Sequence, residues 1–206
     1  MKFSNYINKK IGSTFSYQDK RNNHENWMMI DKHLGENNSV LDVACDTGYY
    51  ALKAAEKGHF VIGFDILKDS LKKAAGRAKS RNIKNVCFLE MALSPSNVLL
   101  LPHFDTILCL SVFQHFFRLY NEERAIQMVI DLLKISRKQL FLQIPSKIGK
   151  YGEGFSVNFN CKKELIDQYI RNIFSDIKQC EVKYIGKKRE KPPTENFRYL
   201  YLIEKK

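Results

Sequence analysis

The chain has 206 residues, 44% of them hydrophobic, and a formal net charge of +12 at pH 7. This length and apolar content predict a single globular domain, 1–206, with enough interior to bury a full core. No apolar run approaches the roughly 20 residues of a membrane span, and the first ten residues lack the apolar block of a secretory signal. We therefore expect a cytoplasmic protein with no membrane span.

The basic charge does not by itself identify a partner. Lys and Arg are spread over several segments, so a generally solvated surface and a polyanion-binding face both remain open. The five cysteines are scattered, odd in number and without a C-x-x-C pair. We expect reduced, packed thiols, and we predict neither a disulfide framework nor a metal site.

The predicted elements of the first half alternate between helix and strand. The N-terminal arm, 1–23, mixes polar, basic and aromatic residues without a clear period, so we expect a loose arm or one short helix. Trp27 lies on the apolar face of the next helix and is expected in the core. Asp69 is expected to cap the helix that it begins. The elements are a helix at 24–34, a strand at 40–43, a helix at 49–56, a strand at 60–64, a helix at 69–81 and a strand at 85–90.

The second half continues the alternation and ends in a hairpin. Residues 94–101 are either a short helix or a loop. The segment 145–160 carries three glycines and no period, which predicts an active-site flap, and Asn160 is expected to cap the helix after it. This order predicts an α/β fold with a doubly wound, mostly parallel sheet and helices on both faces. The elements are a strand at 104–110, a helix at 122–136, a strand at 139–144, a helix at 161–174 and strands at 181–185 and 197–204.

The segment from Ser39 to Ile66 carries the strongest functional signal. Its first strand enters a turn of small residues, and the next helix opens with its free N–H groups toward that turn. Asp65 ends the second strand, where an acidic side chain can hold both hydroxyls of a ribose. Asp42 and Asp46 would repel a pyrophosphate, and Gly48 is the only glycine of the turn, so NAD and FAD are disfavoured. An adenosine cofactor with no phosphate and a cationic end, such as S-adenosylmethionine, suits these acids better.

The sequence VLDVACDTGYYA, followed by GFDI, resembles motif I and the acidic second-strand end of class I S-adenosylmethionine-dependent methyltransferases. The family pattern is roughly acid-x-Gly-x-Gly-x-Gly. Asp42 and Gly48 match its first and last positions, whereas Ala44 and Asp46 replace the other two glycines. The resemblance implies a seven-stranded sheet whose last strand inserts antiparallel, and the predicted terminal hairpin looks like that feature.

The resemblance also implies which residues contact S-adenosylmethionine. Asp42 would lie near the methionine end, Asp65 on the ribose hydroxyls and Ile66 beside the adenine. The family usually has an acid just after the third strand for the adenine amino group, but Met91 and Ala92 stand there in this chain. The expected cofactor-binding residues are Asp42, Ala44, Cys45, Asp46, Gly48, Asp65, Ile66, Met91, Ala92 and Ser111.

The sequence LCLSVFQHFF, after the fourth strand, resembles the segment that lines the active site in small-molecule methyltransferases of this class. The Asn/Asp-Pro-Pro-aromatic sequence of amino-directed nucleic-acid methyltransferases is absent there, which argues against an adenine or cytosine amino acceptor. His115 is the candidate general base, because imidazole titrates near neutrality; packing or capping beside the strand is the alternative. Gln114 could orient a substrate, and Tyr151 and Phe155 of the flap are placed to close over an acceptor.

Three functions remain open at this point. The leading interpretation is an S-adenosylmethionine-dependent methyltransferase that acts on a small or medium-sized acceptor molecule. The basic surface keeps an RNA methyltransferase as an alternative. A methyltransferase fold that has lost catalysis and serves as a binding protein is the third. The sequence identifies neither the acceptor nor the oligomeric state.

Overall fold

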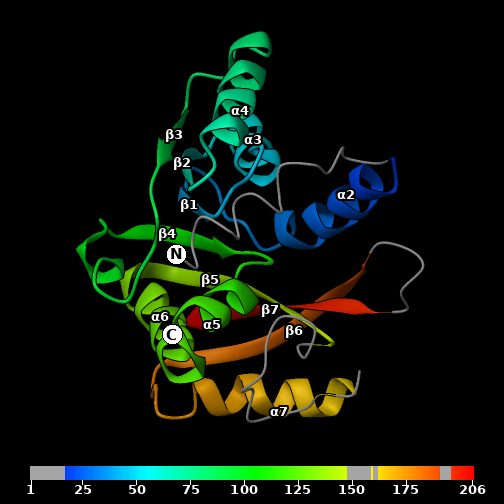
Figure 1. Ribbon diagram of the computed structural model, residues 1–206, viewed down its shortest axis with the longest axis vertical. Coiled ribbons are helices and arrows are strands. Elements are labelled where there is room, and N and C mark those ends of the chain that lie inside the picture. Colours follow the sequence, from blue (N-terminus) through cyan, green and yellow to red (C-terminus); the bar gives the residue numbers. More distant parts are fainter. Residues whose placement is uncertain (1–16, 148–158, 160–161, 191–195) are drawn as a thin grey trace.

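The computed structural model describes residues 17–147, 159, 162–190 and 196–206, with side chains from residue 23 onward. Seven strands form one sheet in the order β3-β2-β1-β4-β5-β7-β6 (Figure 1). Strands β1 to β5 pair in parallel, and β7 is antiparallel to both of its neighbours. The predicted seven-stranded sheet with an antiparallel last strand is confirmed. The strands are β1 Ser39–Val43, β2 Phe60–Asp65, β3 Val86–Glu90, β4 Phe104–Cys109, β5 Ser136–Pro145, β6 Cys180–Arg189 and β7 Phe197–Lys205.

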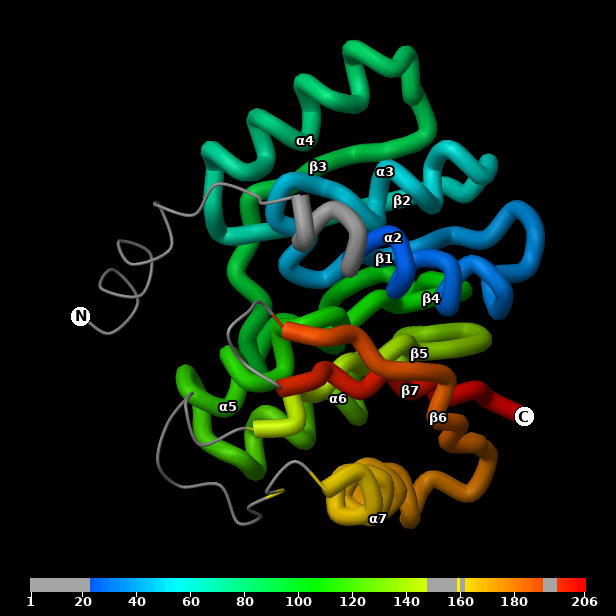
Figure 2. Tube along the Cα trace, turned by 90° about the vertical axis from the view of Figure 1, so that its right-hand side faces the viewer, coloured from blue at the N-terminus to red at the C-terminus, as the bar shows by residue number. Residues whose placement is uncertain are grey.

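Helices cover both faces of the sheet. Helices α2 and α3 pack on one face, in a core that includes Trp27 and Ala54, and α4 lies beside α3 over β2 and β3. Helices α5, α6 and α7 contribute to the larger core on the other face, and α7 lies at the opposite end of the molecule from α4 (Figures 1 and 2). The helices are α2 Tyr17–Asp31, α3 Tyr49–Glu56, α4 Lys68–Ser80, α5 Phe113–Tyr120, α6 Glu122–Ile135 and α7 Lys163–Ile173, with a 3-10 turn, η1, at Val98–Leu100.

The strand order reverses between β1 and β4. In an open parallel sheet, ligands bind outside the carboxyl ends of the strands at such a switch point. Asp42 of β1 pairs in register with Gly63 of β2 and Leu108 of β4. The carboxyl ends of these three strands, and the loops that follow them, therefore define one edge where a site is expected.

Two helices differ from the sequence prediction. Helix α2 begins at Tyr17 and ends at Asp31, so the helix predicted at 24–34 was placed too late, and part of the arm 1–23 is helical. Asn23 and Asn26 of α2 are buried. Because these polar residues stand at buried positions, the first part of the helix lacks the regular spacing of apolar residues from which a helix is predicted. Helix α5 was not predicted at all. Trp27 is buried in the core, as predicted.

Two helix starts were also misjudged. Helix α4 begins at Lys68, and Leu67 occupies its N-cap position. Asp69 lies in the first turn with its side chain 83% exposed, so the predicted Asp69 cap is wrong. Helix α7 begins at Lys163 with Lys162 at its N-cap position, later than the predicted start. Asn160, Tyr151 and Phe155 lie outside the described residues, as does most of the predicted flap.

Two glycines occupy opposite environments. Gly48 precedes α3 with φ 75°, and a Cβ added there would lie 2.9 Å from the Cβ of Ala74 and from the ring of Phe88. Gly76 lies in the middle of α4, and an added Cβ would meet no atom within 4 Å. Gly48 is therefore required by both conformation and space, whereas Gly76 weakens its helix without any packing benefit within the described residues.

We expect Gly48→Ala to lower the free energy of unfolding by about 2–4 kcal/mol, because it adds left-handed strain to a steric clash. Gly76→Ala should raise it by about 0.5–1 kcal/mol, because alanine restricts the unfolded chain and favours the helix. Urea denaturation of the two variants measures both effects. Changes of the same sign in the two variants would contradict this account.

Candidate cofactor and acceptor site

The turn between β1 and α3 has left-handed backbone at all three glycine positions of the family pattern. The φ angles are 55° at Ala44, 48° at Asp46 and 75° at Gly48. Such a conformation costs a non-glycine residue roughly 1–2 kcal/mol, so the surroundings must hold the turn. The N–H of Cys45 donates to the carbonyl of Phe64 in β2 at 2.9 Å, which ties the turn to the neighbouring strand.

Helix α4 holds the same turn from the other side. The Ser70 hydroxyl donates to Oδ1 of Asp46 at 2.7 Å, and Nη1 of Arg77 donates to the carbonyl of Thr47 at 2.9 Å. The Asp46 side chain is therefore bonded to α4. This contact explains how a charged residue replaces the middle glycine of the motif without disrupting the turn.

Asp65 links this turn to the loop that leads into α4. Its Oδ2 accepts the N–H of Asp46 at 2.9 Å and its Oδ1 accepts the N–H of Leu67 at 2.9 Å. The residue is only 3% exposed. Each carboxylate oxygen can accept about two hydrogen bonds, so each retains acceptor capacity for a hydroxyl. The carboxylate is oriented by the backbone before any ligand binds.

Asp42 is the buried acid of the site. It is 2% exposed, and its Oδ2 accepts the N–H of Ala51 in α3 at 3.0 Å. The pKa of Asp42 is raised to about 8, mainly by burial; the bond from Ala51 lowers it, and the nearby carboxylates of Asp65 and Asp46 contribute to the rise. Asp42 is therefore mostly protonated at neutral pH, and a cation beside it would favour its ionised form.

These acids fit the charge of S-adenosylmethionine better than that of a dinucleotide. The carboxyl groups of Asp42, Asp46 and Asp65 lie around the turn. Ionised carboxylates attract a sulfonium and an ammonium, whose charge also favours ionisation of Asp42, and they repel a pyrophosphate. Of the residues expected beside the adenine, Ile66 and Met91 are half-buried and Ala92 is exposed. Asn97 fixes the loop after β3 by donating to the carbonyl of Ala92 at 2.9 Å. The residues described therefore fit the cofactor that the motif implies.

A buried polar network lies at the carboxyl ends of β4 and β5, and sequence reasoning missed it. The hydroxyl of Ser111, which has φ 59°, donates to Oε1 of Gln143 at 2.7 Å. Gln143 donates in turn to Asn26 of α2 at 2.9 Å, and Asn26 donates to the Tyr50 hydroxyl at 2.9 Å. Asn26 and Gln143 are 0% exposed. A glutamine within the apolar strand FLQIP was the available signal.

Helix α5 begins directly after this network and carries the candidate base. His115 is half-buried, and its backbone N–H donates to the carbonyl of Val112 at 2.8 Å. Gln114 is buried and donates to the carbonyl of Ser111 at 2.6 Å, while its Oε1 has no hydrogen-bond partner within the described part of the chain. Phe113, Phe116 and Phe117 of α5 are buried in the core.

The two cysteines of this region are poor nucleophiles. Cys45 and Cys109 are buried, and burial together with the charge of Asp42 raises the pKa of both thiols well above the usual range. They are therefore protonated at neutral pH. Among the described residues, no group of three His, Cys, Asp or Glu side chains could hold a metal ion, and no helix is long and apolar enough to cross a membrane.

The fold and this edge define a class I S-adenosylmethionine-dependent methyltransferase, and comparisons with known proteins agree. Residues 34–198 match the profile of the methyltransferase domain family, so the chain belongs to that family. The predicted family is confirmed, and with it S-adenosylmethionine as the cofactor.

Similar proteins include enzymes with different acceptors. A provisionally named ribosomal RNA large subunit methyltransferase of Methanocaldococcus jannaschii is 34% identical over 77 residues, which are 37% of this chain but only 19% of that protein. The magnesium protoporphyrin IX methyltransferase of Synechocystis PCC 6803, solved with bound S-adenosylmethionine, has a TM-score of 0.67 at 16% identity and covers 95% of this chain and 86% of its own. The bifunctional kinase-methyltransferase WbdD has a TM-score of 0.66 at 20% identity, over 92% of this chain and 40% of its own.

We expect Asp42→Asn to change stability in a pH-dependent way. Burial raises the pKa of Asp42 from 3.8 to about 8, so the stability contributed by the protonated carboxyl is fully present below the unfolded pKa and is lost as pH rises through the folded pKa. Asparagine has no such loss. The melting temperature of the variant relative to the natural protein should therefore rise between pH 5 and pH 9. A difference that is constant over this range would place the Asp42 pKa near its unfolded value.

Proposed function

We propose that this chain transfers the methyl group of S-adenosylmethionine to an acceptor beside the carboxyl ends of β4 and β5. The observation that carries the proposal is the carboxylate of Asp65, held by two backbone N–H groups at the end of β2. Asp65 would take the ribose hydroxyls, and Asp42 would lie toward the cationic methionine end. The remaining contacts would come from Ala44, Cys45, Asp46, Gly48, Ile66, Met91, Ala92 and Ser111.

The chemistry asks little of the protein beyond positioning. S-adenosylmethionine would supply a methyl group on a sulfonium, and an acceptor atom would take this methyl group by in-line displacement of the sulfur, which leaves as S-adenosylhomocysteine. The chain has to hold donor and acceptor in line, exclude water and remove a proton where the acceptor carries one. His115, at the start of α5 and half-buried, is the side chain that we assign to the proton. The buried bond between Ser111 and Gln143 fixes the loop that leads to it.

A small or medium-sized acceptor is the first candidate. The segment from Ser111 to Gln114 stands where amino-directed nucleic-acid methyltransferases carry Asn/Asp-Pro-Pro-aromatic. Its backbone and side chains are bonded within the protein, and they offer no equivalent clamp for a base amino group. Hydroxyl, carboxyl, ring-nitrogen and thiol acceptors remain compatible with this edge.

RNA is the second candidate acceptor. Two observations favour it: the net charge of +12, and the name of the relative from Methanocaldococcus jannaschii, which describes a ribosomal RNA methyltransferase. The absent amino-acceptor motif leaves other positions on RNA open. The third interpretation, a binding protein without catalysis, predicts no cofactor affinity and is decided by the experiment that follows.

We expect Asp65→Ala to weaken binding of S-adenosylhomocysteine by about 1–3 kcal/mol, or about 5- to 150-fold in Kd, because the ribose loses its charged acceptor. Isothermal titration calorimetry measures this. Asp105→Ala is the matched control, because Asp105 also accepts a backbone N–H, that of Ser39 at 2.9 Å, but at the opposite edge of the sheet. Equal loss in both variants would mean general destabilisation. No heat from the natural protein at millimolar ligand would leave only the non-catalytic interpretation.

We expect His115→Ala to lower methyl transfer at least tenfold while leaving S-adenosylhomocysteine affinity unchanged, because general base catalysis typically contributes 10²–10⁴-fold. Transfer can be followed from methyl-labelled S-adenosylmethionine into fractions of a cell extract. His103→Ala is the control, since His103 is exposed just before β4, at the other edge of the sheet. Unchanged transfer in His115→Ala would reassign this histidine to packing.

A further inference from the structure

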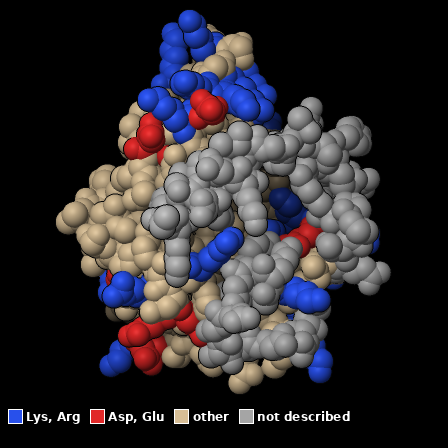
Figure 3. All heavy atoms as spheres, viewed as in Figure 1, with Lys and Arg blue, Asp and Glu red and all other residues tan. Residues whose placement is uncertain are grey.

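Half of the net charge of the chain is concentrated on one short segment. Residues 67–85 hold seven Lys or Arg and one Asp, a net charge of +6 against +12 for the whole chain. Figure 3 shows Lys and Arg gathered over the end of the molecule where α4 lies. We call this the α4 surface; it consists of Lys68, Lys72, Lys73, Arg77, Lys79, Arg81 and Lys84, all of them exposed.

Few of these charges are neutralised. Within the described part of the chain, Lys72 pairs with Asp69 at 3.6 Å and Arg81 pairs with Glu56 at 3.0 Å. Both pairs are exposed, so they contribute little to stability. Five cations of the α4 surface have no ion pair to any described residue: Lys68, Lys73, Arg77, Lys79 and Lys84.

The arrangement of the charges opposes the stability of the helix. Lys68 and Lys72 are four residues apart, as are Lys73 and Arg77, and Arg77 and Arg81. Like charges at this spacing repel one another on the helix surface and destabilise it. Apart from Arg77, which bonds to the Thr47 carbonyl, packing does not require them, because the buried side of α4 is formed by Leu71, Ala74 and Ala78. The cations therefore need an explanation outside the fold.

Gly76 adds an independent observation at the centre of this surface. It is exposed in the middle of α4, and an added Cβ would meet no atom within 4 Å. Lys72 and Lys73 lie one turn before it, and Lys79 and Ser80 one turn after it, on the same side of the helix. The glycine thus leaves a bare spot flanked by the ammonium groups of Lys72, Lys73 and Lys79, where an anionic group can approach the helix backbone closely.

We propose that the α4 surface binds the phosphate backbone of RNA. Helix α4 has 13 residues, so at 1.5 Å per residue it presents a basic surface about 20 Å long, enough for several successive phosphates. Its outward side carries no large apolar residue to insert into a lipid layer, which argues against a membrane. The identification of the polyanion as RNA rests on the proposed function, because RNA is one of its two candidate acceptors.

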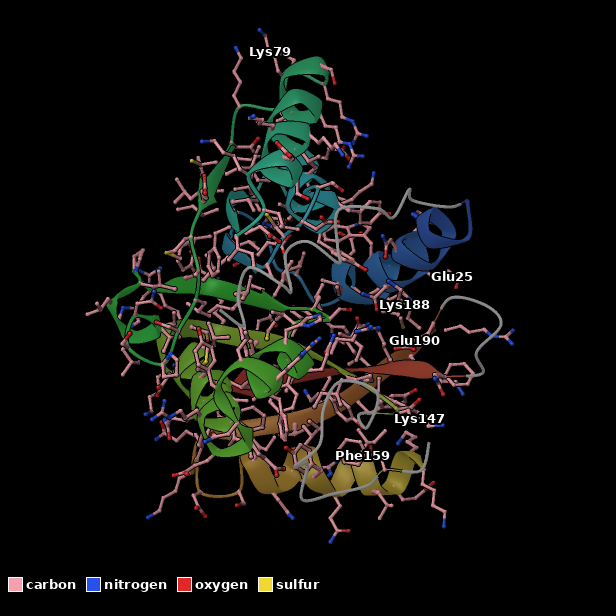
Figure 4. The ribbon with its side chains drawn as sticks, viewed as in Figure 1. Glu25, Lys79, Lys147, Phe159, Lys188 and Glu190 are labelled. Carbon is pink, nitrogen blue, oxygen red and sulfur yellow. The ribbon has the colours of Figure 1, made fainter. Side chains whose placement is uncertain are left out.

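The position of α4 connects this surface to the methyl-transfer edge. Lys68 begins the helix directly after Leu67, whose N–H is bound by Asp65. Lys79, near the other end, points into solvent at the tip of the molecule (Figure 4). An RNA strand bound along α4 would therefore have one end at the proposed cofactor site. Arg77 also donates a hydrogen bond from α4 to the Thr47 carbonyl of the motif I turn at 2.9 Å. One residue of the α4 surface therefore contacts the turn directly.

The test is fluorescence anisotropy with a labelled 20-nucleotide single-stranded RNA at several salt concentrations. The triple variant Lys72→Glu, Lys73→Glu, Lys79→Glu should bind at least tenfold more weakly, and the slope of log K against log salt should become shallower by about 2, at roughly 0.7 per lost phosphate contact. Gly76→Leu, which fills the bare spot without changing charge, should weaken binding severalfold. The matched control reverses three exposed cations away from α4: Lys32, Arg171 and Lys178.

Three results would overturn the proposal. Equal weakening of RNA binding in the triple variant and in the control would mean that RNA binds to the overall positive charge of the protein and not to the α4 surface. Equal α4-dependent binding of duplex DNA or of phosphatidylserine vesicles would remove the assignment to RNA. Absence of RNA binding by the natural protein would reject both the α4 surface as a binding site and its assignment to RNA. Calorimetry with S-adenosylhomocysteine on the same samples separates this proposal from the proposed function: α4-dependent RNA binding without cofactor binding keeps the surface and rejects methyl transfer.

Discussion

The carboxylate of Asp65 is the contact on which the rest of the site depends. It joins the end of β2 to the motif I turn through Asp46 and to the start of α4 through Leu67. Helix α4 in turn donates hydrogen bonds to the motif I turn from Ser70 and Arg77. Ala44 and Asp46 have left-handed backbone, which is strained in non-glycine residues, and these bonds from two sides hold the turn in that conformation. The turn is therefore preorganised by the protein itself, as a ligand site requires.

The same helix separates two regions of opposite charge. Toward the sheet edge, it contacts a turn surrounded by the carboxylates of Asp42, Asp46 and Asp65. Toward solvent, it carries the net charge of +6 of residues 67–85. The acidic side suits a cationic cofactor and the basic side suits a polyanion, and each would repel the ligand of the other. Charge thus offers a physical reason why one chain can bring a cationic methyl donor and an anionic partner to neighbouring places.

Local rules were sufficient for the part of the fold that carries the motif. The strand, turn, helix and strand from β1 to β2 begin and end within a residue of their predicted limits, because small turn residues and continuous apolar strands leave few alternatives. The antiparallel last strand came from the family resemblance. The helix α5 was missed because its aromatic residues pack into the core on one short helix, a pattern shared with a buried strand.

The candidate site was predictable in its acids but not in its connections. Asp42 and Asp65 are recognisable from their places at the ends of strands. The hydrogen bonds between Asp46 and Ser70 and between Gln143 and Asn26 join residues that are 24 and 117 positions apart. A single sequence does not indicate which distant polar residues will pair in the fold. Asp69 was assigned a capping role from residue type alone, but the helix begins one residue earlier, at Lys68, with Leu67 at the N-cap position and no side-chain cap bond.

The central claim is that the ribose of S-adenosylmethionine lies on Asp65, beside the motif I turn. A crystal structure of the complex with S-adenosylhomocysteine tests it most directly. The account predicts both ribose hydroxyls within about 2.5–3.0 Å of the Asp65 carboxylate oxygens, with the Asp46 side chain still bonded to Ser70. A ligand bound elsewhere, or an Asp65 carboxylate that contacts only its two backbone N–H groups in the complex, would contradict it.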